Sequence, residues 1–438
     1  MPNPVDAATT ASTYPMTIKT AGTMPAGTEV YLVAYGQNAS GYVYYDWDNG
    51  DWKPVTDGVS LPSHNYKTTA TGAPETIITI DVPELSGARV YVSYGKAVDF
   101  KGNVGNGVST PNPWKASDPM HKSMVDKIEF TTSNNSGLYD LSINTTCVDF
   151  FGIPLSYKVS GYAGATTKSP SVTFEEGITA TRAEIYNDIN SDPIFRKLLQ
   201  RPDGGGADSY YRILAPGTSI VKDVDNFPNN FFDSYIDYCW TKVFTTEAGA
   251  PYIELENINP LHVPVGVPTI MYRGSMKNNN GVDQLVFTAS AGNPTDGFTP
   301  VAEVVVDRPT TLQVMTGTID ATATPIGNGN AGDATSAKGF VTAQLSAAIC
   351  RTNLHVMDAS GKCTTSTQWA DFNNFYKQDV APFENDPANG YANDLYSQVL
   401  HNHSINHRCY SSPYSDQYGW SAFSAVFNPT TWEVTLGY

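Results

Sequence analysis

The sequence predicts a mainly β protein whose second half is mixed α/β. Up to about residue 157, short β-branched and aromatic runs alternate with Gly, Pro, Asn and Asp, which is typical of strands joined by turns. Beyond about residue 175, apolar residues recur at helical spacing between the remaining strand-like runs. With 438 residues the chain is long enough for two core-forming domains, or for one large β domain with insertions.

The chain divides into three expected parts. We predict a disordered start over residues 1–14, a β-barrel or β-sandwich over 15–175, and a mixed α/β portion over 176–438. The last alternating segment, 431–437, is expected to form a strand that returns to a sheet. We expect the β and α/β portions to meet in a cleft, where ligands tend to bind.

Individual elements follow from local patterns. Strong strand signals lie at residues 29–35, 41–45, 76–82 and 88–94. A helix is predicted over 181–201, with an interruption at Asp192-Pro193. Further predicted helices cover residues 231–244, 340–354, 368–378 and 393–400, and further predicted strands cover 283–288, 301–306 and 311–314.

The charge balance excludes some partners. A formal net charge of −17 repels polyphosphate, so nucleic acid is a poor partner. A neutral polysaccharide meets no such repulsion, and the 26 Tyr and 7 Trp provide flat rings that can lie against sugar faces. Tyrosine-rich strands are also simply good strands, so the aromatic content alone does not decide the function.

Cysteine usage and hydropathy add limits. The five cysteines form no CxxC or zinc-binding Cys/His pattern, and Cys239 and Cys350 lie in apolar helical stretches, so we expect buried free thiols. The redox compartment stays open. No stretch approaches 18 apolar residues, so no membrane span is predicted. The start has no leader pattern, which indicates a leader that was removed or never present.

Two carboxylates twenty positions apart, Glu129 and Asp149, are the main candidates for chemistry. One carboxyl can protonate a departing glycosidic oxygen while the other activates a water. Ile128 and Phe130 alternate with Glu129 and Thr131, so the acid and the hydroxyl are expected on the polar face of one strand. The alternative is that both acids are ordinary solvent-facing residues in a chain with 43 acids.

The spacing of the pair makes a geometric prediction. If Glu129 and Asp149 face each other across antiparallel strands, Tyr139 lies at the tip of a long loop. A tight hairpin turned at residues 133–137 would leave Asp149 about eight residues out of register, roughly 26 Å away. The catalytic interpretation therefore predicts a long or twice-bent connection between the strands.

Residues 147–155, preceded by Glu129-Phe130-Thr131, resemble the family 64 glycoside hydrolases, which are β-1,3-glucanases with a thaumatin-like architecture. The likeness continues in the same order downstream and covers roughly residues 120–438. Its further segments are residues 211–217, 232–240, 343–351, 404–406 and 410–416.

The resemblance implies a thaumatin-like β-barrel or sandwich domain and a mixed α/β domain that flank a wide groove for β-1,3-glucan. It implies an inverting endo-1,3-β-glucanase that releases short laminari-oligosaccharides, with Glu129 as general acid and Asp149 as general base. The matching positions also imply substrate contacts by Thr131 and Thr146, and Tyr139 stands where the resemblance leads us to expect an aromatic, usually Trp. Asp416 is either a substrate-binding acid at the rim of the cleft or a capping or turn residue. Thr146 is three residues from Asp149, so a bulge or a strand end is needed between them.

The expected protein needs no cofactor and no metal, acts outside the cell and is a monomer. His401, His403 and His407 lie close together with Cys409, but their spacing fits no familiar zinc signature, so structural histidines are expected. Arg212 and Arg351 lie in the matched segments, where each would clamp a groove carboxylate or form a structural salt bridge.

Two other functions stay open at this point. One is a non-catalytic thaumatin-like protein that binds β-1,3-glucan or acts against fungi, because the Glu-to-Asp spacing is longer than the resemblance leads us to expect. The other is a structural or partner-binding protein that uses the same scaffold. Hydrolysis of laminarin by the native protein separates the first interpretation from both.

Overall fold

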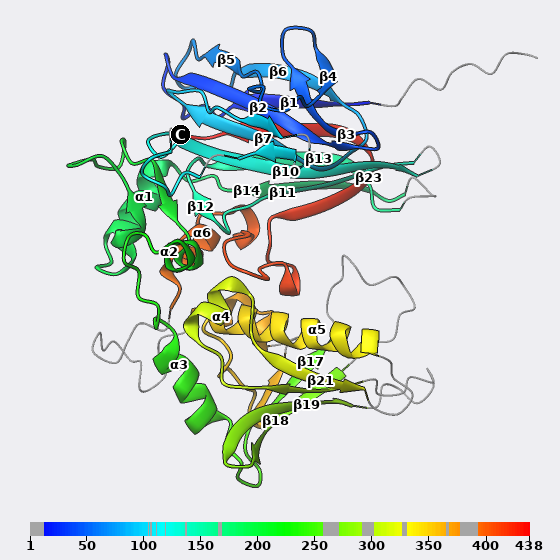
Figure 1. The fold of residues 1–438 in the computed structure, drawn as a ribbon, viewed down its shortest axis with the longest axis vertical. Coiled ribbons are helices and arrows are strands. Elements are labelled where there is room, and N and C mark those ends of the chain that lie inside the picture. Colours follow the sequence, from blue (N-terminus) through cyan, green and yellow to red (C-terminus); the bar gives the residue numbers. More distant parts are fainter. Residues whose placement is uncertain are drawn as a thin grey trace, which may run out of the picture.

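The computed structural model shows a β lobe stacked on an α/β lobe (Figure 1). The N-terminal strands and the C-terminal strand belong to the same lobe, although they lie at opposite ends of the sequence. The structure describes residues 13–103, 105, 107–110, 112–118, 120–135, 138–164, 169–256, 271–290, 302–325, 331–364, 368–376 and 393–438.

One large, curled sheet forms the β lobe. In the described chain it has 12 strands, in the order β14-β13-β23-β11-β10-β7-β2-β3-β4, with β1 pairing β23 and β6, and β5 pairing β2. The strands are β1 (Tyr14–Thr20), β2 (Glu29–Asn38), β3 (Gly41–Asp46), β4 (Asp51–Pro54), β5 (His64–Lys67), β6 (Thr76–Val82), β7 (Leu85–Tyr94), β10 (Met124–Asn135), β11 (Leu138–Thr145), β13 (Leu155–Tyr162), β14 (Ser171–Gly177) and β23 (Phe423–Leu436).

Alternation along these strands separates the two faces of the sheet. Ile128 and Phe130 of β10 and Ile143 of β11 are buried in the core on the inner face. The outer face is covered at one end by the second lobe, because Tyr91 and Val125 belong to the core shared with that lobe. Lys127, Glu129 and Thr131 of β10 share this outer face with Val125.

The α/β lobe has its own six-stranded sheet among the described residues, in the order β21-β20-β19-β18-β17-β22. The long helix α5 packs against β20 and β21 (Figure 1). The elements are β17 (Tyr252–Glu256), β18 (Met271–Asn279), β19 (Val282–Ser290), β20 (Ala302–Val306), α4 (Thr311–Thr316), β21 (Ala321–Pro325), α5 (Ala331–Cys350) and β22 (Lys362–Thr364).

Short elements join the lobes. A three-stranded sheet in the order β12-β16-β15 pairs the segment after β11 with strands from beyond residue 198, and a small β8-β9 hairpin precedes β10. These elements are β8 (Lys101–Asn103), β9 (Gly107–Ser109), β12 (Phe150–Phe151), α1 (Arg182–Asn190), η1 (Phe195–Leu198), β15 (Leu199–Gln200), β16 (Arg212–Leu214), α2 (Pro216–Lys222), α3 (Asp233–Tyr238), η2 (Cys239–Val243), η5 (Phe372–Asn374), α6 (Leu395–Asn402), η7 (Ile405–His407) and η8 (Gln417–Gly419).

The predicted fold class, mainly β with an α/β portion, is confirmed. The interruption at Asp192-Pro193 is also confirmed, because α1 ends at Asn190 and a 3₁₀ helix begins at Phe195. The predicted strand at 311–314 is wrong. A capping box, in which the Thr310 hydroxyl accepts from Gln313 N and the Gln313 side chain accepts from Thr310 N, starts helix α4 there.

Some of the predicted segments lie partly outside the described residues. Residues 1–12 of the expected disordered start lie outside the described part of the chain, as do 377 and 378 of the helix expected at 368–378. No described helix is long and apolar enough to cross a membrane. All five cysteines are free and buried, so the expectation for Cys239 and Cys350 is confirmed.

Candidate active site

Sheet register places Glu129 in a row of side chains on the outer face. Arg89 of β7, Glu129 of β10, Asn144 of β11 and Phe423 of β23 are successive cross-strand partners. They border a pocket of about 170 Å³. Its described lining consists of Gly87, Arg89, Glu129, Phe130, Thr131, Ser142, Asn144 and Phe423.

Glu129 is held by two cations on one of its oxygens. Arg89 donates from Nε to Glu129 Oε1 at 2.8 Å, and Lys127 Nζ lies 3.5 Å from the same oxygen. Tyr35 Oη, 3.5 Å from Arg89 Nη1, accepts a hydrogen bond that steadies the guanidinium from β2. Within the described chain, no hydrogen bond or ion pair engages Glu129 Oε2, so that oxygen is open to a ligand.

Asp149 joins this group through Lys127. Lys127 Nζ is 3.4 Å from Asp149 Oδ2. Because the same nitrogen is 3.5 Å from Glu129 Oε1 and 3.4 Å from Asp149 Oδ2, these two oxygens are separated by at most the sum, about 7 Å. The Asp149 side chain is 52% exposed and that of Glu129 is 24% exposed, so water reaches Asp149 more readily.

The predicted long connection between the two acids is wrong. The β10–β11 ladder continues to Asn135 opposite Leu138, so the hairpin is tight, and Glu129 is opposite Asn144 rather than Asp149. Asp149 approaches because β11 ends at Thr145 and the chain then leaves the ladder before β12. The long side chain of Lys127 spans the remaining gap.

Buried groups fix the irregular segment that carries Asp149. The Asp126 carboxylate accepts from Gly152 N at 2.8 Å and from Ile153 N at 3.1 Å. Arg182 donates from Nε to Gly152 O at 2.8 Å, and Ala215 N donates to Asp149 O at 3.0 Å. The segment therefore has a defined path although it belongs to no long strand.

Asp126 and Lys127 are neighbours on β10 that point to opposite faces. Asp126 is only 2% exposed, and burial raises its pKa to about 7, while its backbone hydrogen bonds lower the pKa by less. The buried acid therefore braces the turn at Gly152, and the lysine beside it reaches the two exposed acids.

The two threonines occupy different environments. Thr131 is exposed, lines the pocket and accepts from Gly87 N at 3.1 Å, at a bulge in the β7–β10 register. Thr146 is 9% exposed and bridges to Tyr410 just beyond the end of β11. A strand end does separate this segment from β11, but it lies at Thr145, so that neither Thr146 nor Asp149 belongs to a strand of the large sheet.

Tyr139 does not reach the pocket. It is opposite Asn134 in the tight hairpin and is 1% exposed, with its ring centroid 4.1 Å from that of Tyr14. Its hydroxyl donates to Val82 O at 3.3 Å. The prediction that Tyr139 lies at a loop tip is wrong, because the chain turns between Asn135 and Leu138 and Tyr139 already belongs to β11. A buried ring offers no face to a sugar.

Asp416 lies in the C-terminal loop, directly before η8. Burial raises the pKa of Tyr410 to about 12, and the negative charges of Asp416 and Glu129 raise it in the same direction. Asp416 Oδ1 is buried and has no hydrogen-bond partner among the described atoms. Arg351 fixes the loop by donating from Nη2 to Ser415 O and Gln417 O, each at 3.0 Å.

Within the described chain, Arg212 contacts backbone carbonyls and the Gln200 side chain rather than a carboxylate. The contacts of Arg351 to the Asp416 loop are to backbone carbonyls, and Arg212, which is fully buried, donates to Pro113 O at 2.5 Å, Met120 O at 2.9 Å and Ser123 O at 2.7 Å. The expected groove clamp or salt bridge is therefore wrong for Arg212 among the described residues. A planar guanidinium with five donors suits clusters of otherwise unpaired carbonyls.

The three histidines make separate structural contacts. His401 is buried with Nδ1 2.6 Å from His407 O, and burial lowers its pKa to about 3. His403 contacts Asp188 at 2.7 Å, and the ring of His407 stacks on Phe372. In the part of the chain that the structure describes, no three His, Cys, Asp or Glu side chains gather as a metal would require.

Sequence reasoning missed three residues at the site: Lys127, which contacts both acids, and Arg89 and Asn144, which line the pocket. Lys127 was detectable, because it lies two positions before Glu129 and therefore on the same strand face. Arg89 and Asn144 are cross-strand partners, and their position depends on a register that no local pattern in the sequence specifies. Asn144 Oδ1 is buried without a hydrogen-bond partner in the described chain.

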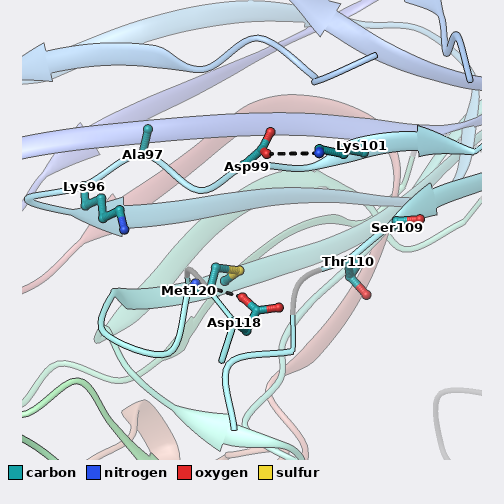
Figure 2. A pocket seen from close by; sticks show the side chains of 8 residues that line it. All are labelled: Lys96, Ala97, Asp99, Lys101, Ser109, Thr110, Asp118 and Met120. Atoms are coloured by element: carbon teal, nitrogen blue, oxygen red, sulfur yellow. Dashed lines mark hydrogen bonds and ion pairs between the residues drawn. The ribbon is translucent and has the colours of Figure 1, made fainter. Parts of the chain in front are cut away.

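A second hollow, of about 310 Å³, lies beyond the end of β7, and Figure 2 shows the side chains that line it. Lys96 is seven positions from Arg89, roughly 23 Å along an extended chain, so the hollow is separate from the catalytic pocket. Asp118 accepts from Asn112 N and Met120 N, and Asp99 is 3.9 Å from Lys101. Its acids thus stabilise loops.

Comparison with known proteins gives one family and several solved relatives. The family model of the glycoside hydrolase 64 β-1,3-glucanases matches residues 14–436. A laminaripentaose-producing β-1,3-glucanase, solved in complex with laminaritetraose, aligns with 97% of this chain and 98% of its own, at 21% identity and a TM-score of 0.66.

Two further structures have the same fold. A β-1,3-glucanase domain from Clostridium beijerinckii aligns with 97% of this chain and 98% of its own, at 22% identity and a TM-score of 0.61. The laminaripentaose-producing enzyme of Paenibacillus barengoltzii, complexed with laminarihexaose, aligns with 97% of this chain and 75% of its own, at 17% identity and a TM-score of 0.56. No curated protein sequence matches the chain.

Proposed function

The chain belongs to glycoside hydrolase family 64, the β-1,3-glucanases, and we propose that it is an inverting endo-hydrolase in which Glu129 is the general acid and Asp149 the general base. The observation that carries this proposal is the shared contact of both carboxyls with Lys127 Nζ, at 3.5 Å and 3.4 Å. The resulting limit of about 7 Å is compatible with the roughly 6.5–9.5 Å separation that leaves room for a water in inverting enzymes.

Each carboxyl keeps one oxygen for the reaction. Arg89 and Lys127 both contact Glu129 Oε1, which leaves Oε2 to carry the proton that goes to the glycosidic oxygen. Lys127 contacts Asp149 Oδ2, which leaves Oδ1 to take a proton from the attacking water. The higher exposure of Asp149, 52% against 24%, supports its role as the base that faces solvent.

Glu129 and Asp149 together account for both proton transfers in the reaction. Water attacks the anomeric carbon on the face opposite the leaving sugar, Asp149 receives one proton from that water, and Glu129 delivers its own proton to the oxygen of the departing chain. The C–O bond to the leaving sugar breaks as the bond to water forms. Proton exchange with solvent then restores both carboxyls.

The substrate in this proposal is β-1,3-glucan, as laminarin, curdlan or fungal cell-wall glucan, cut internally into short laminari-oligosaccharides. Thr131 at the pocket and Asp416 at its C-terminal side are the proposed sugar contacts, with Thr146 beside them. Because such polymers lie outside the cell, we propose an extracellular, monomeric enzyme. Sizing of the purified protein and fractionation of its source test these two statements.

Hydrolysis of laminarin by the native protein and by Glu129→Gln and Asp149→Asn variants tests the assignment. General acid–base groups contribute roughly 10²–10⁴-fold to rate, so each variant is expected to lose at least about 10²-fold in kcat. The matched control is Glu175→Gln, because Glu175 is an exposed strand residue 3.9 Å from Lys158 and is not in the pocket lining.

The outcomes separate the alternatives. Wild-type rates in either catalytic variant would remove that residue from the mechanism. Binding of the native protein to insoluble β-1,3-glucan without any released sugar would instead support the non-catalytic alternative, and failure to bind any glucan would support a structural role.

A further inference from the structure

Lys127 lies between the two proposed catalytic carboxyls and is nearly equidistant from them. Its Nζ is 3.5 Å from Glu129 Oε1 and 3.4 Å from Asp149 Oδ2, and its side chain is only 12% exposed. Arg89, by contrast, has its carboxylate contact with Glu129 alone among the described residues. The Lys127 ammonium therefore contacts both acids, whereas the Arg89 guanidinium contacts only Glu129 of the two.

The Lys127 contact is also the tether of the Asp149 side chain. In the described chain, no other cation contacts that carboxylate, which is 52% exposed on a segment outside the large sheet. Two ionised carboxylates held this close repel each other, and the repulsion is stronger near a protein than in bulk water. A partly buried ammonium between them offsets the repulsion and limits how far Asp149 can swing away.

The contact of the Lys127 ammonium with both Glu129 and Asp149 suits a reaction in which negative charge moves from one acid to the other. Before the reaction, Asp149 is the carboxylate and Glu129 carries the proton. As Asp149 takes a proton from water and Glu129 releases its own, the negative charge passes to Glu129. A cation equidistant from both stays in contact with whichever acid is charged and needs no rearrangement during the step.

We infer that Lys127 is a positioning residue for the hydrolysis: it sets the separation of the acid and the base and accompanies the charge that passes between them. This inference rests on the proposed roles of Glu129 and Asp149. Lys127 is not proposed to touch sugar, since it does not line the described pocket.

Other charged and titratable groups surround this triad and contribute to any pH dependence. They come from β2, β7, β10 and the C-terminal loop, and they are Tyr35, Arg89, Tyr91, Asp126, Tyr410 and Asp416. All of these groups are unchanged in a Lys127 variant, so a difference in pH profile from the native protein reports on the ammonium.

The test compares Lys127→Met, which keeps the length and removes the charge, with Lys127→Arg, which keeps the charge. Displacement of a reacting group by about 1 Å can lower the rate roughly 10²-fold, so Lys127→Met is expected to lower kcat by about that factor with little change in KM. Loss of the cation favours the protonated forms of nearby carboxyls, so the pH profile is expected to move to higher pH.

Lys127→Arg is expected to recover the pH profile and only part of kcat, because a guanidinium cannot occupy the same point between the acids. The matched control is Lys158→Met, whose lysine is 3.9 Å from Glu175 on an exposed strand and should leave kcat, KM and pH profile at native values. A merely structural role would lower thermal stability and the fraction of active protein without moving the pH profile.

A crystal structure of Lys127→Met gives a readout that needs no activity. The expected result is a separation of Glu129 Oε1 and Asp149 Oδ2 well beyond the present limit of about 7 Å. Native kcat and pH profile in Lys127→Met would overturn the inference while leaving the proposed function intact. If the native protein does not hydrolyse glucan, the proposed function fails, and an unchanged carboxyl separation in the variant would also overturn the positioning role.

Discussion

Glu129 and Asp149 contribute to one site but are held in place by different kinds of structure. Glu129 lies in the middle of β10, between β7 and β11, where regular backbone ladders on both sides fix its position. Asp149 lies between the end of β11 and the two-residue strand β12. Its position depends on buried polar contacts to the backbone around Gly152.

The Asp149 segment should be more sensitive to single substitutions than the strand that carries Glu129. A sheet distributes the loss of one contact over many ladder hydrogen bonds, whereas an irregular segment relies on a few buried partners. Changes to those partners should move Asp149 and leave Glu129 in place. Substitutions around Gly152 should therefore disturb the site more through Asp149 than through Glu129.

Arg182→Met should have the largest effect on stability. Arg182 is 2% exposed and donates from Nε to Gly152 O at 2.8 Å and from Nη2 to Tyr210 O at 2.5 Å. Each buried carbonyl left unpaired costs about 1–3 kcal/mol, so we expect a loss of about 4 kcal/mol, measured by denaturant unfolding. A loss below about 1 kcal/mol would show that water or a neighbour replaces the arginine.

Gly152→Ala should lower stability nearly as much as Arg182→Met, because of a steric clash. A Cβ at Gly152 would lie 2.0 Å from Val125 O, so either the segment or β10 must shift. We expect a loss of about 3 kcal/mol in the free energy of unfolding, and a fall in kcat because Asp149 moves with the segment. Gly339→Ala, in helix α5 with open space around it, is the control and should be neutral or slightly stabilising.

Asp126→Asn should change how stability depends on pH more than it changes the stability at any one pH. Burial raises the Asp126 pKa from 3.8 to about 7 in the folded protein, so the unfolded chain releases this proton first. The contribution of Asp126 is fully present below about pH 3.8 and is lost as pH rises through 7. We therefore expect the Tm of the native protein to fall over this window and the Tm of Asp126→Asn to fall less.

Other buried carboxyls act in the same direction. Burial raises the pKa of Glu176 to about 7 and that of Asp394 to about 6, so some decline of Tm should persist in the Asp126 variant. Identical Tm profiles for the native protein and Asp126→Asn would contradict the assignment of this buried acid as a proton-binding group.

The same contrast explains what the sequence could predict. The alternation of Ile128 and Phe130 with Glu129 placed the first acid on the open face of a strand, because strand alternation is a local property. The position of Asp149 could not be predicted in this way. The assumption that both acids share one ladder led to a long connection and to Tyr139 at its tip, and both are wrong.

Long-range register limited the prediction of the pocket as well. Arg89 precedes Glu129 by 40 positions and meets it only because β7 and β10 pair in one particular register. In the α/β lobe, the strand predicted at Thr311 failed for a local reason, since the Thr310–Gln313 capping box outweighs the β-propensity of its neighbours.

The anomeric configuration of the first product tests directly whether Glu129 and Asp149 act as the acid and base of an inverting hydrolase. Time-resolved ¹H NMR of a laminarin digest, recorded before mutarotation, should show the α-anomer first, because a water placed by Asp149 attacks the face opposite the leaving sugar. Initial release of the β-anomer would require a covalent intermediate and carboxyls about 5–5.5 Å apart, and would contradict the roles given to Glu129 and Asp149.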